Sequence, residues 1–163
     1  MMKIGLLSDT HGYFDDKLMR FFSDVDELWH AGDIGNIETA DKIAAFKPLR
    51  AVHGNIDGAT VRRVYPRVQK FTSEGVGVFM VHIGGYPGRY EPGVKDEALL
   101  AKPKLFISGH SHILKVIYDK KNGWLHVNPG AAGVSGFHRV RTAVRFTVAG
   151  GDIRDMEVGE WKR

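Results

Sequence analysis

Seven side chains that can bind metal ions follow short apolar runs of this sequence. Each run ends in a turn that carries one or two oxygen or imidazole donors. The seven are Asp9, His11, Asp33, Asn55, His82, His110 and His112. Because the loops beyond the carboxyl ends of parallel strands meet at one crevice of an open α/β sheet, five such loops can surround a metal centre. The sequence therefore predicts a metal site built from five strand ends.

The number of donors predicts two divalent ions rather than one. A catalytic zinc usually takes three protein ligands and a water, so seven donors exceed what one such ion needs. Divided between two ions, they leave positions open for water and substrate, and a shared carboxylate would hold the ions about 3.5–4 Å apart. Nitrogen and oxygen donors without thiolate suit Mn²⁺, our first expectation, and Ni²⁺, Fe²⁺, Zn²⁺ or Co²⁺ as alternatives.

Each short motif is a weak signal alone, because a single loop histidine is more often hydrogen-bonded than metal-binding. The repetition of an apolar run followed by a donor at five places is what favours a metal centre. Four other histidines are expected to have different roles. His30 and His53 should pack or support the turns beside them, His126 should alternate within a strand, and His138 should lie at the surface or the rim.

The elements that must position the donors alternate between strands and helices in the first half of the chain. The apolar runs predict strands over residues 4–7, 27–30, 49–52, 76–81 and 105–108. Apolar residues at helical spacing predict helices within residues 14–22, 37–44 and 94–101, and Pro48 and Pro103 follow the last two. This alternation is typical of βαβ units with right-handed crossovers.

The second half of the chain has the pattern of antiparallel strands. Residues 114–118 and 124–127 flank a polar turn that ends in Asn122-Gly123, as in a hairpin. Residues 140–148 alternate, which places Arg139, Arg141 and Arg145 on a face that we expect to be solvated. We predict one domain over residues 1–163, with two stacked sheets and helices outside them.

Composition narrows the function classes. Of 163 residues, 43% are hydrophobic and 26% are charged, which excludes a disordered or fibrous chain, and the absence of cysteine excludes thiol catalysis. A net charge of +4 suits a phosphate-bearing substrate and is too small to indicate nucleic acid. Since no targeting signal or membrane-length apolar run is present, we expect a soluble cytoplasmic protein.

In this order, the donor motifs resemble the signature of the calcineurin-like metallophosphoesterase superfamily. The motifs are Asp9-x-His11, Gly32-Asp33, Gly54-Asn55, His82 and Gly109-His110-x-His112. The short length and Asn128-Pro129-Gly130 are similar to its small bacterial and archaeal phosphodiesterase branch. The resemblance covers residues 3 to about 130 and implies a four-layer α/β/β/α sandwich of two mixed sheets flanked by helices.

The resemblance also implies how the donors divide between two ions. The first ion would be bound by Asp9, His11, Asp33 and His112. The second would be bound by Asp33, Asn55, His82 and His110. A hydroxide bridging the ions would attack a small phosphate ester, a diester rather than a monoester, with catalytic roles for Asn55, Asp33 and His110.

Two departures from the wider superfamily concern the leaving group. Ile56 stands where many members have a histidine that assists the departing oxygen, and His82-Ile83-Gly84-Gly85 lacks the Gly-His that often follows. We therefore expect a preference for good leaving groups. The stretch Gly84–Tyr90 suits either substrate recognition or an ordinary surface loop.

Two other functions stay open at this stage. One is a protein-interaction scaffold, similar to the retromer subunit that shares this fold and has lost hydrolytic activity; the unbroken donor set disfavours it. The other is a nuclease, which would normally need a larger basic surface or an added DNA-binding domain. A homo-oligomer is compatible with the sequence.

Overall fold

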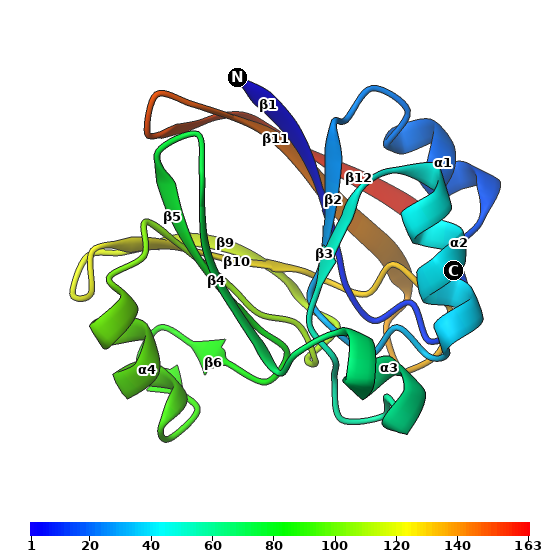
Figure 1. The fold of residues 1–163 in the computed structure, drawn as a ribbon, viewed down its shortest axis with the longest axis horizontal. Helices are drawn as coiled ribbons and strands as arrows, with labels where there is room; N and C mark the ends of the chain where they lie inside the picture. The colour runs from blue at the N-terminus through cyan, green and yellow to red at the C-terminus, as the bar shows by residue number, and fades with distance from the viewer.

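Two five-stranded sheets stack face to face in the computed structural model, which describes residues 1–163 (Figure 1). The first sheet has the order β12-β11-β1-β2-β3. Its strands are β1 (Met2–Leu7), β2 (Glu27–His30), β3 (Leu49–Ala51), β11 (Val140–Ala149) and β12 (Asp152–Lys162). Strands β1, β2 and β3 are parallel, whereas β11 is antiparallel to both β1 and β12. The first sheet is therefore mixed, with the parallel strands at one side.

The second sheet is also mixed and has the order β4-β5-β8-β10-β9. Its strands are β4 (Val68–Ser73), β5 (Val76–Val81), β8 (Leu105–Ile107), β9 (Leu114–Asp119) and β10 (Trp124–Pro129). The three central strands are parallel, and the edge strands β4 and β9 are antiparallel to their neighbours. A small hairpin of β6 (Gly85–Tyr86) and β7 (Arg89–Tyr90) follows β5.

The helices form the two outer layers. They are α1 (Asp16–Phe21), α2 (Ile37–Phe46), α3 (Ala59–Val64) and α4 (Val94–Ala101). Residues of α1 and α2 pack with the outer face of the first sheet, and α4 packs on the outer face of the second (Figure 1). The main core lies between the sheets and includes Ile4, Trp29 and Ile107. The predicted four-layer sandwich is confirmed.

Local sequence explains where the helices begin and how closely they pack. Asp15 and Asn36 cap α1 and α2, because their side chains accept the N–H groups of Leu18 and Thr39. Gly5 in β1 lies beneath α1, and a Cβ there would come within 2.6 Å of a ring carbon of Phe22. The strand therefore needs glycine at this position to let the helix approach.

The prediction of a solvated arginine face on β11 is wrong. Arg141 is only 2% exposed. Its guanidinium donates to both carboxylate oxygens of Asp15 at 2.9 Å and to the Ala132 carbonyl at 2.7 Å. Arg145 donates to the Phe21 carbonyl at 2.7 Å. The face is covered because α1 packs against it, and only Arg139 is exposed as expected.

Candidate metal centre

The loops that carry the seven predicted donors meet at the carboxyl ends of β1, β2, β3, β5 and β8. Backbone hydrogen bonds join these loops directly. The Asp9 N–H donates to the Gly32 carbonyl at 2.9 Å, the His11 N–H donates to the Asp33 carbonyl at 3.0 Å, and the Gly109 N–H donates to the His82 carbonyl at 2.9 Å. The structure thus brings together side chains that are up to 103 positions apart, from Asp9 to His112.

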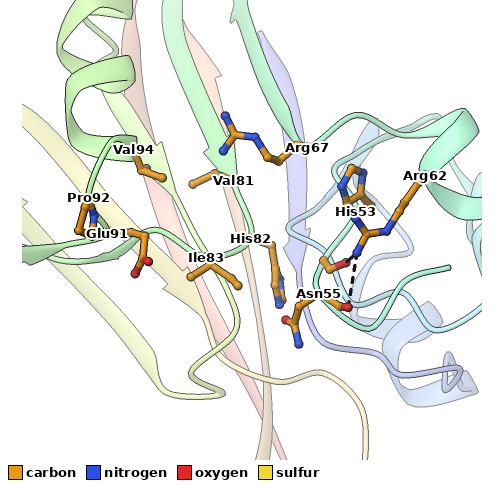
Figure 2. A pocket seen from close by; sticks show the side chains of 11 residues that line it. His53, Asn55, Arg62, Arg67, Val81, His82, Ile83, Glu91, Pro92 and Val94 are labelled. Carbon is orange, nitrogen blue, oxygen red and sulfur yellow. Dashed lines mark hydrogen bonds between the residues drawn. The ribbon is translucent and has the colours of Figure 1, made fainter. Parts of the chain in front are cut away.

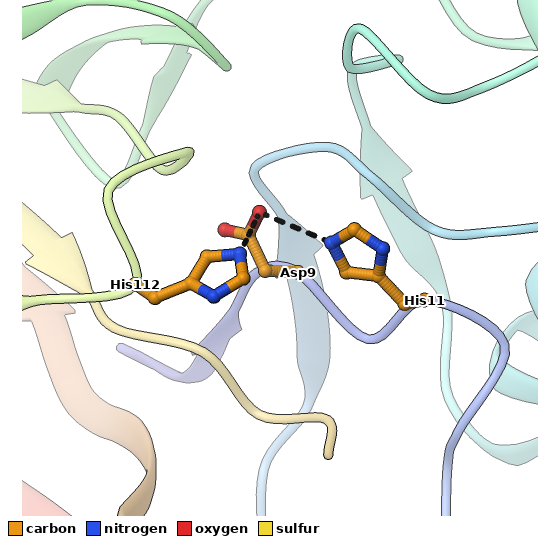
Figure 3. Close-up of side chains that lie close together, drawn as sticks. All are labelled: Asp9, His11 and His112. Carbon is orange, nitrogen blue, oxygen red and sulfur yellow. Dashed lines mark ion pairs between the residues drawn. The ribbon is translucent and has the colours of Figure 1, made fainter. Parts of the chain in front are cut away.

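Six of the donors form two groups, each with ligand atoms within 4.8 Å of one another. Site A consists of Asp9, His11 and His112, and site B consists of Asp33, His82 and His110. In site A, Nε2 of His112 lies 3.2 Å and Nε2 of His11 lies 3.7 Å from the same oxygen, Oδ1 of Asp9 (Figure 3). In site B, Nε2 of His82 lies 3.1 Å from Oδ2 of Asp33.

Asp33 lies between the two groups, and Asn55 lies beside site B at the surface. Oδ2 of Asp33 also lies 3.5 Å from Nε2 of His11, so this carboxylate stands between site B and site A. Nδ1 of His110 lies 3.0 Å from Oδ1 of Asn55, which places the seventh predicted donor beside site B. His110 and Asn55 are exposed, whereas Asp9, Asp33 and His82 are buried.

Three buried polar atoms in the two sites have no hydrogen-bond partner: Oδ1 of Asp9, Nε2 of His11 and Nε2 of His82. His82 donates from Nδ1 to the Ala31 carbonyl at 2.7 Å, which turns Nε2 toward Asp33. An unpartnered buried polar atom costs about 1–3 kcal/mol. Divalent cations at the two sites would accept lone pairs from these atoms, and mixed nitrogen and oxygen donors are those that such cations bind. The residues therefore fit a metal.

The electrostatics of the sites favour two ionised carboxylates. Burial opposes ionisation of Asp9, but the imidazoles of His11 and His112 lower its pKa far below the ordinary value. Burial also opposes ionisation of Asp33, but His82 lowers the pKa of this carboxyl below its ordinary value. In turn, Asp33 raises the pKa of His82 despite burial. A pair of cations would supply the positive charge that these carboxylates attract.

The backbone at the donors is unusual. Five of the seven residues have a positive φ, between 47° and 73°: Asp9, His11, Asp33, His110 and His112. Such values are uncommon for residues other than glycine, and strained backbone tends to cluster at functional sites. The turns thus hold the side chains in place at a cost in folding energy.

Asp57 and Gly54 hold the loop after β3 against the loop after β2. The Asp57 carboxylate accepts the N–H groups of Gly54 at 2.8 Å, Ile34 at 3.1 Å and Gly35 at 2.9 Å. A Cβ on Gly54 would lie 2.1 Å from Oδ1 of Asp33. Asp57 therefore orients both its own loop and the loop that carries Asp33.

His138 supports site A, although the sequence predicted only a surface or rim residue. Its Nε2 donates to the Gly133 carbonyl at 2.8 Å, since a carbonyl can only accept. Neutral His138 therefore has a free lone pair on Nδ1. This atom lies 3.2 Å from Nδ1 of His112 and accepts a hydrogen bond from the N–H group there. In a neutral His112 imidazole, Nε2 then carries the lone pair that a metal ion can accept, and it faces Asp9. No local motif marked this role, because the two histidines are 26 positions apart.

The remaining histidines have separate surroundings. His30 is buried, accepts the Gly32 N–H on Nδ1 at 3.1 Å and has Nε2 3.0 Å from the Thr10 hydroxyl, so its predicted supporting role is confirmed. His126 is buried in β10, and neither ring nitrogen has a partner. His53 donates from Nδ1 to the Tyr65 carbonyl at 2.9 Å and lines a cavity of about 340 Å³ next to Asn55 and His82 (Figure 2).

The loop Gly84–Tyr90 forms the β6–β7 hairpin and contacts the loop that carries His110 and His112. The Tyr86 hydroxyl is hydrogen-bonded to the Ser111 hydroxyl, between those two histidines. Asn128 donates to the Gly109 carbonyl at 3.0 Å and to the Ser111 hydroxyl at 3.2 Å. This hairpin therefore contacts the loop that supplies one histidine to each site.

Comparison with known proteins agrees with this geometry. Residues 2–151 match the model of the calcineurin-like phosphoesterase superfamily domain. A probable metallophosphoesterase from Methanothermobacter thermautotrophicus is 29% identical over 142 residues, which cover 82% of this chain and 78% of the relative.

Solved structures show the same fold. Vps29 from Chaetomium thermophilum superposes with a TM-score of 0.76 at 17% identity and full coverage of both chains. Vps29 from Entamoeba histolytica, complexed with Zn²⁺, superposes with a TM-score of 0.72 at 14% identity and 99% coverage of both chains. None of the helices in this protein is long and apolar enough to cross a membrane.

Proposed function

Because this chain belongs to the calcineurin-like phosphoesterase superfamily, we propose that it hydrolyses phosphate esters with two divalent metal ions, and diesters in preference to monoesters. The observation that carries the proposal is the meeting of two donor groups in which three buried polar atoms lack a partner. A cavity beside Asn55 and His82 offers room for one organic group of an ester. The diester preference follows the small phosphodiesterase branch that the sequence resembles.

We assign the donors to the two ions around a shared Asp33. The first ion is assigned to Asp9, His11, Asp33 and His112. The second is assigned to Asp33, Asn55, His82 and His110. Asp33 suits the shared role, since Oδ2 lies within 3.5 Å of imidazole nitrogens from both sites. Its other oxygen, Oδ1, accepts the Ile56 N–H at 3.0 Å, which holds the carboxylate in one orientation.

The chain's own groups would bind and orient the ester. Two divalent cations in such a site supply an activated water as nucleophile and offset charge on the phosphoryl oxygens. Nδ1 of His110 donates to Oδ1 of Asn55, so the amide N–H groups of Asn55 stay free to donate to a phosphoryl oxygen. Both side chains are exposed and can reach a substrate. Mn²⁺ is our first choice of metal, and the Zn²⁺ complex of a structural neighbour supports zinc as an alternative.

The test is metal removal followed by reconstitution. Chelator-stripped protein should hydrolyse neither bis-p-nitrophenyl phosphate nor p-nitrophenyl phosphate, and Mn²⁺ or Ni²⁺ should restore activity with the higher kcat/KM on the diester. Asp33→Asn tests the shared carboxylate without changing the size of the side chain. This variant should lose both activity and the two-ion stoichiometry. Full activity in stripped protein, with metal content measured, would contradict the proposal.

The same preparation distinguishes the two rival functions. A scaffold is supported by the Vps29 neighbours, one of which is complexed with a cyclic peptide. Metal-loaded protein that binds two ions but hydrolyses no monoester, diester or cyclic nucleotide would favour that function. Cleavage of DNA at rates above those on small diesters would favour a nuclease.

A further inference from the structure

The cavity beside site B has the surface of a binding site for an organic group. It lies between the end of β5, the start of α4 and the loop after β3 (Figure 2). Val81, Ile83 and Val94 give it an apolar wall, and Figure 2 shows them across the cavity from His53 and Asn55. Buried apolar contacts of this kind stabilise a ligand by about 25 cal/mol per Å² of apolar surface removed from water.

Two arginines and one glutamate line the cavity beside its apolar wall. Arg62 donates to the Asp57 carbonyl at 2.6 Å and to the Gly54 carbonyl at 3.2 Å. Arg67 is paired with Glu97, and the carboxylate of Glu91 also lines the cavity. Both guanidinium groups thus already have hydrogen-bond partners within the protein, and Val81, Ile83 and Val94 remain as the surface for an uncharged group.

The size of the cavity limits what can enter it. Ligand pockets are typically about 300–1,000 Å³, so a volume of about 340 Å³ is near the lower limit. It suits one ring-bearing group and is too small for a peptide segment or an oligonucleotide. Asn55 and His82 line the cavity and are also proposed ligands at site B, so a phosphorus atom at site B can have one substituent inside the cavity.

We propose that this cavity binds an aromatic, ring-bearing substituent of the phosphodiester substrate against Val81, Ile83 and Val94. The inference rests on the proposed function, because it takes the phosphoryl group to lie at site B. It narrows the substrate to diesters with an aryl or nucleoside-like group, as opposed to diesters of small alcohols.

Binding of two phosphonates to the Mn²⁺-loaded protein tests this inference without turnover. Phenylphosphonate and methylphosphonate carry the same head group and one substituent each, so the ratio of their Kd values, measured by calorimetry, isolates the substituent. We expect phenylphosphonate to bind about tenfold more tightly. Ile83→Trp should remove this preference by filling the cavity, and Ile83→Ala should reduce it by removing part of the apolar wall.

Ile113→Trp is the matched control. Ile113 follows His112 as Ile83 follows His82, but it is exposed and lies outside the cavity. This variant should keep the wild-type ratio of Kd values. Metal content and thermal unfolding are measured for each variant, and Ile83→Ala decides the test if Ile83→Trp does not fold.

Equal affinity for the two phosphonates, no binding of either, or a preference that survives both Ile83 variants would overturn the inference. Hydrolysis of bis-p-nitrophenyl phosphate is measured on the same preparation. Protein that hydrolyses this diester without a phenyl preference keeps the proposed function and loses the inference. Protein with the phenyl preference but no hydrolysis keeps the cavity assignment and loses the proposed function.

Discussion

Site A and site B use the same kinds of donor in different surroundings. In site A, other groups of the protein form hydrogen bonds to the donors. Oδ2 of Asp9 accepts hydrogen bonds from the Ser8 hydroxyl at 2.6 Å and from the His110 N–H at 3.0 Å. Nδ1 of His138 accepts a hydrogen bond from His112. The donors of site A do not line the cavity. We therefore expect site A to hold an ion in a fixed geometry.

Site B is more open. His110 is exposed, Asn55 beside it is exposed, and His82 lines the cavity. We expect the two sites to have different roles, because supporting hydrogen bonds tune metal affinity and open positions admit substrate. We expect variants near site B to change turnover and variants near site A to change metal affinity.

The largest expected effect is that of Asn55→Ala at site B. Removing one donor to a phosphoryl oxygen typically lowers kcat about 10²–10³-fold. The melting temperature should hold, because the side chain is exposed. Asn55→Asp keeps an oxygen ligand and loses the N–H groups, so it should retain two ions and still lose most of the rate. Wild-type turnover in Asn55→Ala with both ions bound would remove Asn55 from the catalytic residues.

His138→Ala should act on site A alone. Loss of a residue that supports a metal-binding histidine typically lowers metal affinity about 10–100-fold. Titration with Mn²⁺ should show one weakened and one unchanged binding step. His138→Gln, whose amide oxygen can accept the same proton from His112, should recover part of the loss. An equal loss at both steps would show that His138 only supports the fold.

Ile56→His tests whether site B lacks a group that protonates the leaving oxygen. We expect wild-type rates to fall steeply as the pKa of the leaving group rises, since no acid follows Asn55. An imidazole there should flatten that dependence, with a gain of roughly tenfold or more for alkoxide leaving groups. Metal content must equal that of the wild type. A wild-type rate insensitive to the leaving-group pKa, with chemistry rate-limiting, would show that another residue supplies the proton.

The smallest effect on turnover is expected for His126, which lies outside both sites. Its ring stacks on Phe106 and lies near Tyr86 and Tyr90. Burial lowers its pKa from 6.5 to about 4, whereas Asp33 raises the pKa of buried His82. Between pH 6.5 and about pH 4, His126 binds a proton in the unfolded chain but not in the folded chain. The free energy of unfolding therefore falls as the pH falls through this range.

His126→Phe should therefore flatten the acid side of the stability profile. Because burial lowers this pKa from 6.5 to about 4, at about 1.4 kcal/mol per pKa unit the wild type loses about 3 kcal/mol of stability to this residue near pH 4. Urea unfolding between pH 4.5 and 7.5 measures it, and activity at pH 7.5 should be unchanged. Part of the acid loss remains, because burial also lowers the pKa of His30 to about 4. An unchanged profile would show that the His126 site is hydrated.

Local patterns predicted much of the fold. Apolar runs closed by turns predicted β2 and β5 at their observed bounds, and the Asn-Gly turn predicted the β9–β10 hairpin. Helix α3 was not predicted, because its six residues bury only Val61, and the half-exposed edge strand β4 lacked a clear pattern. The burial of Arg141 was missed for another reason: alternation shows that a strand has two faces, but not which of them a helix covers.

The sequence by itself determined which donors exist and that each follows a strand, because both are local properties of the chain. The family resemblance implied a division of the donors around Asp33, but only the tertiary structure decided how close the donors of each group lie and that His138 lies beside His112. These relations depend on distances between loops that are far apart in the chain, as in the 101 positions between Asp9 and His110. Sheet order sets such distances, and it follows from the packing of two sheets and four helices rather than from any single stretch.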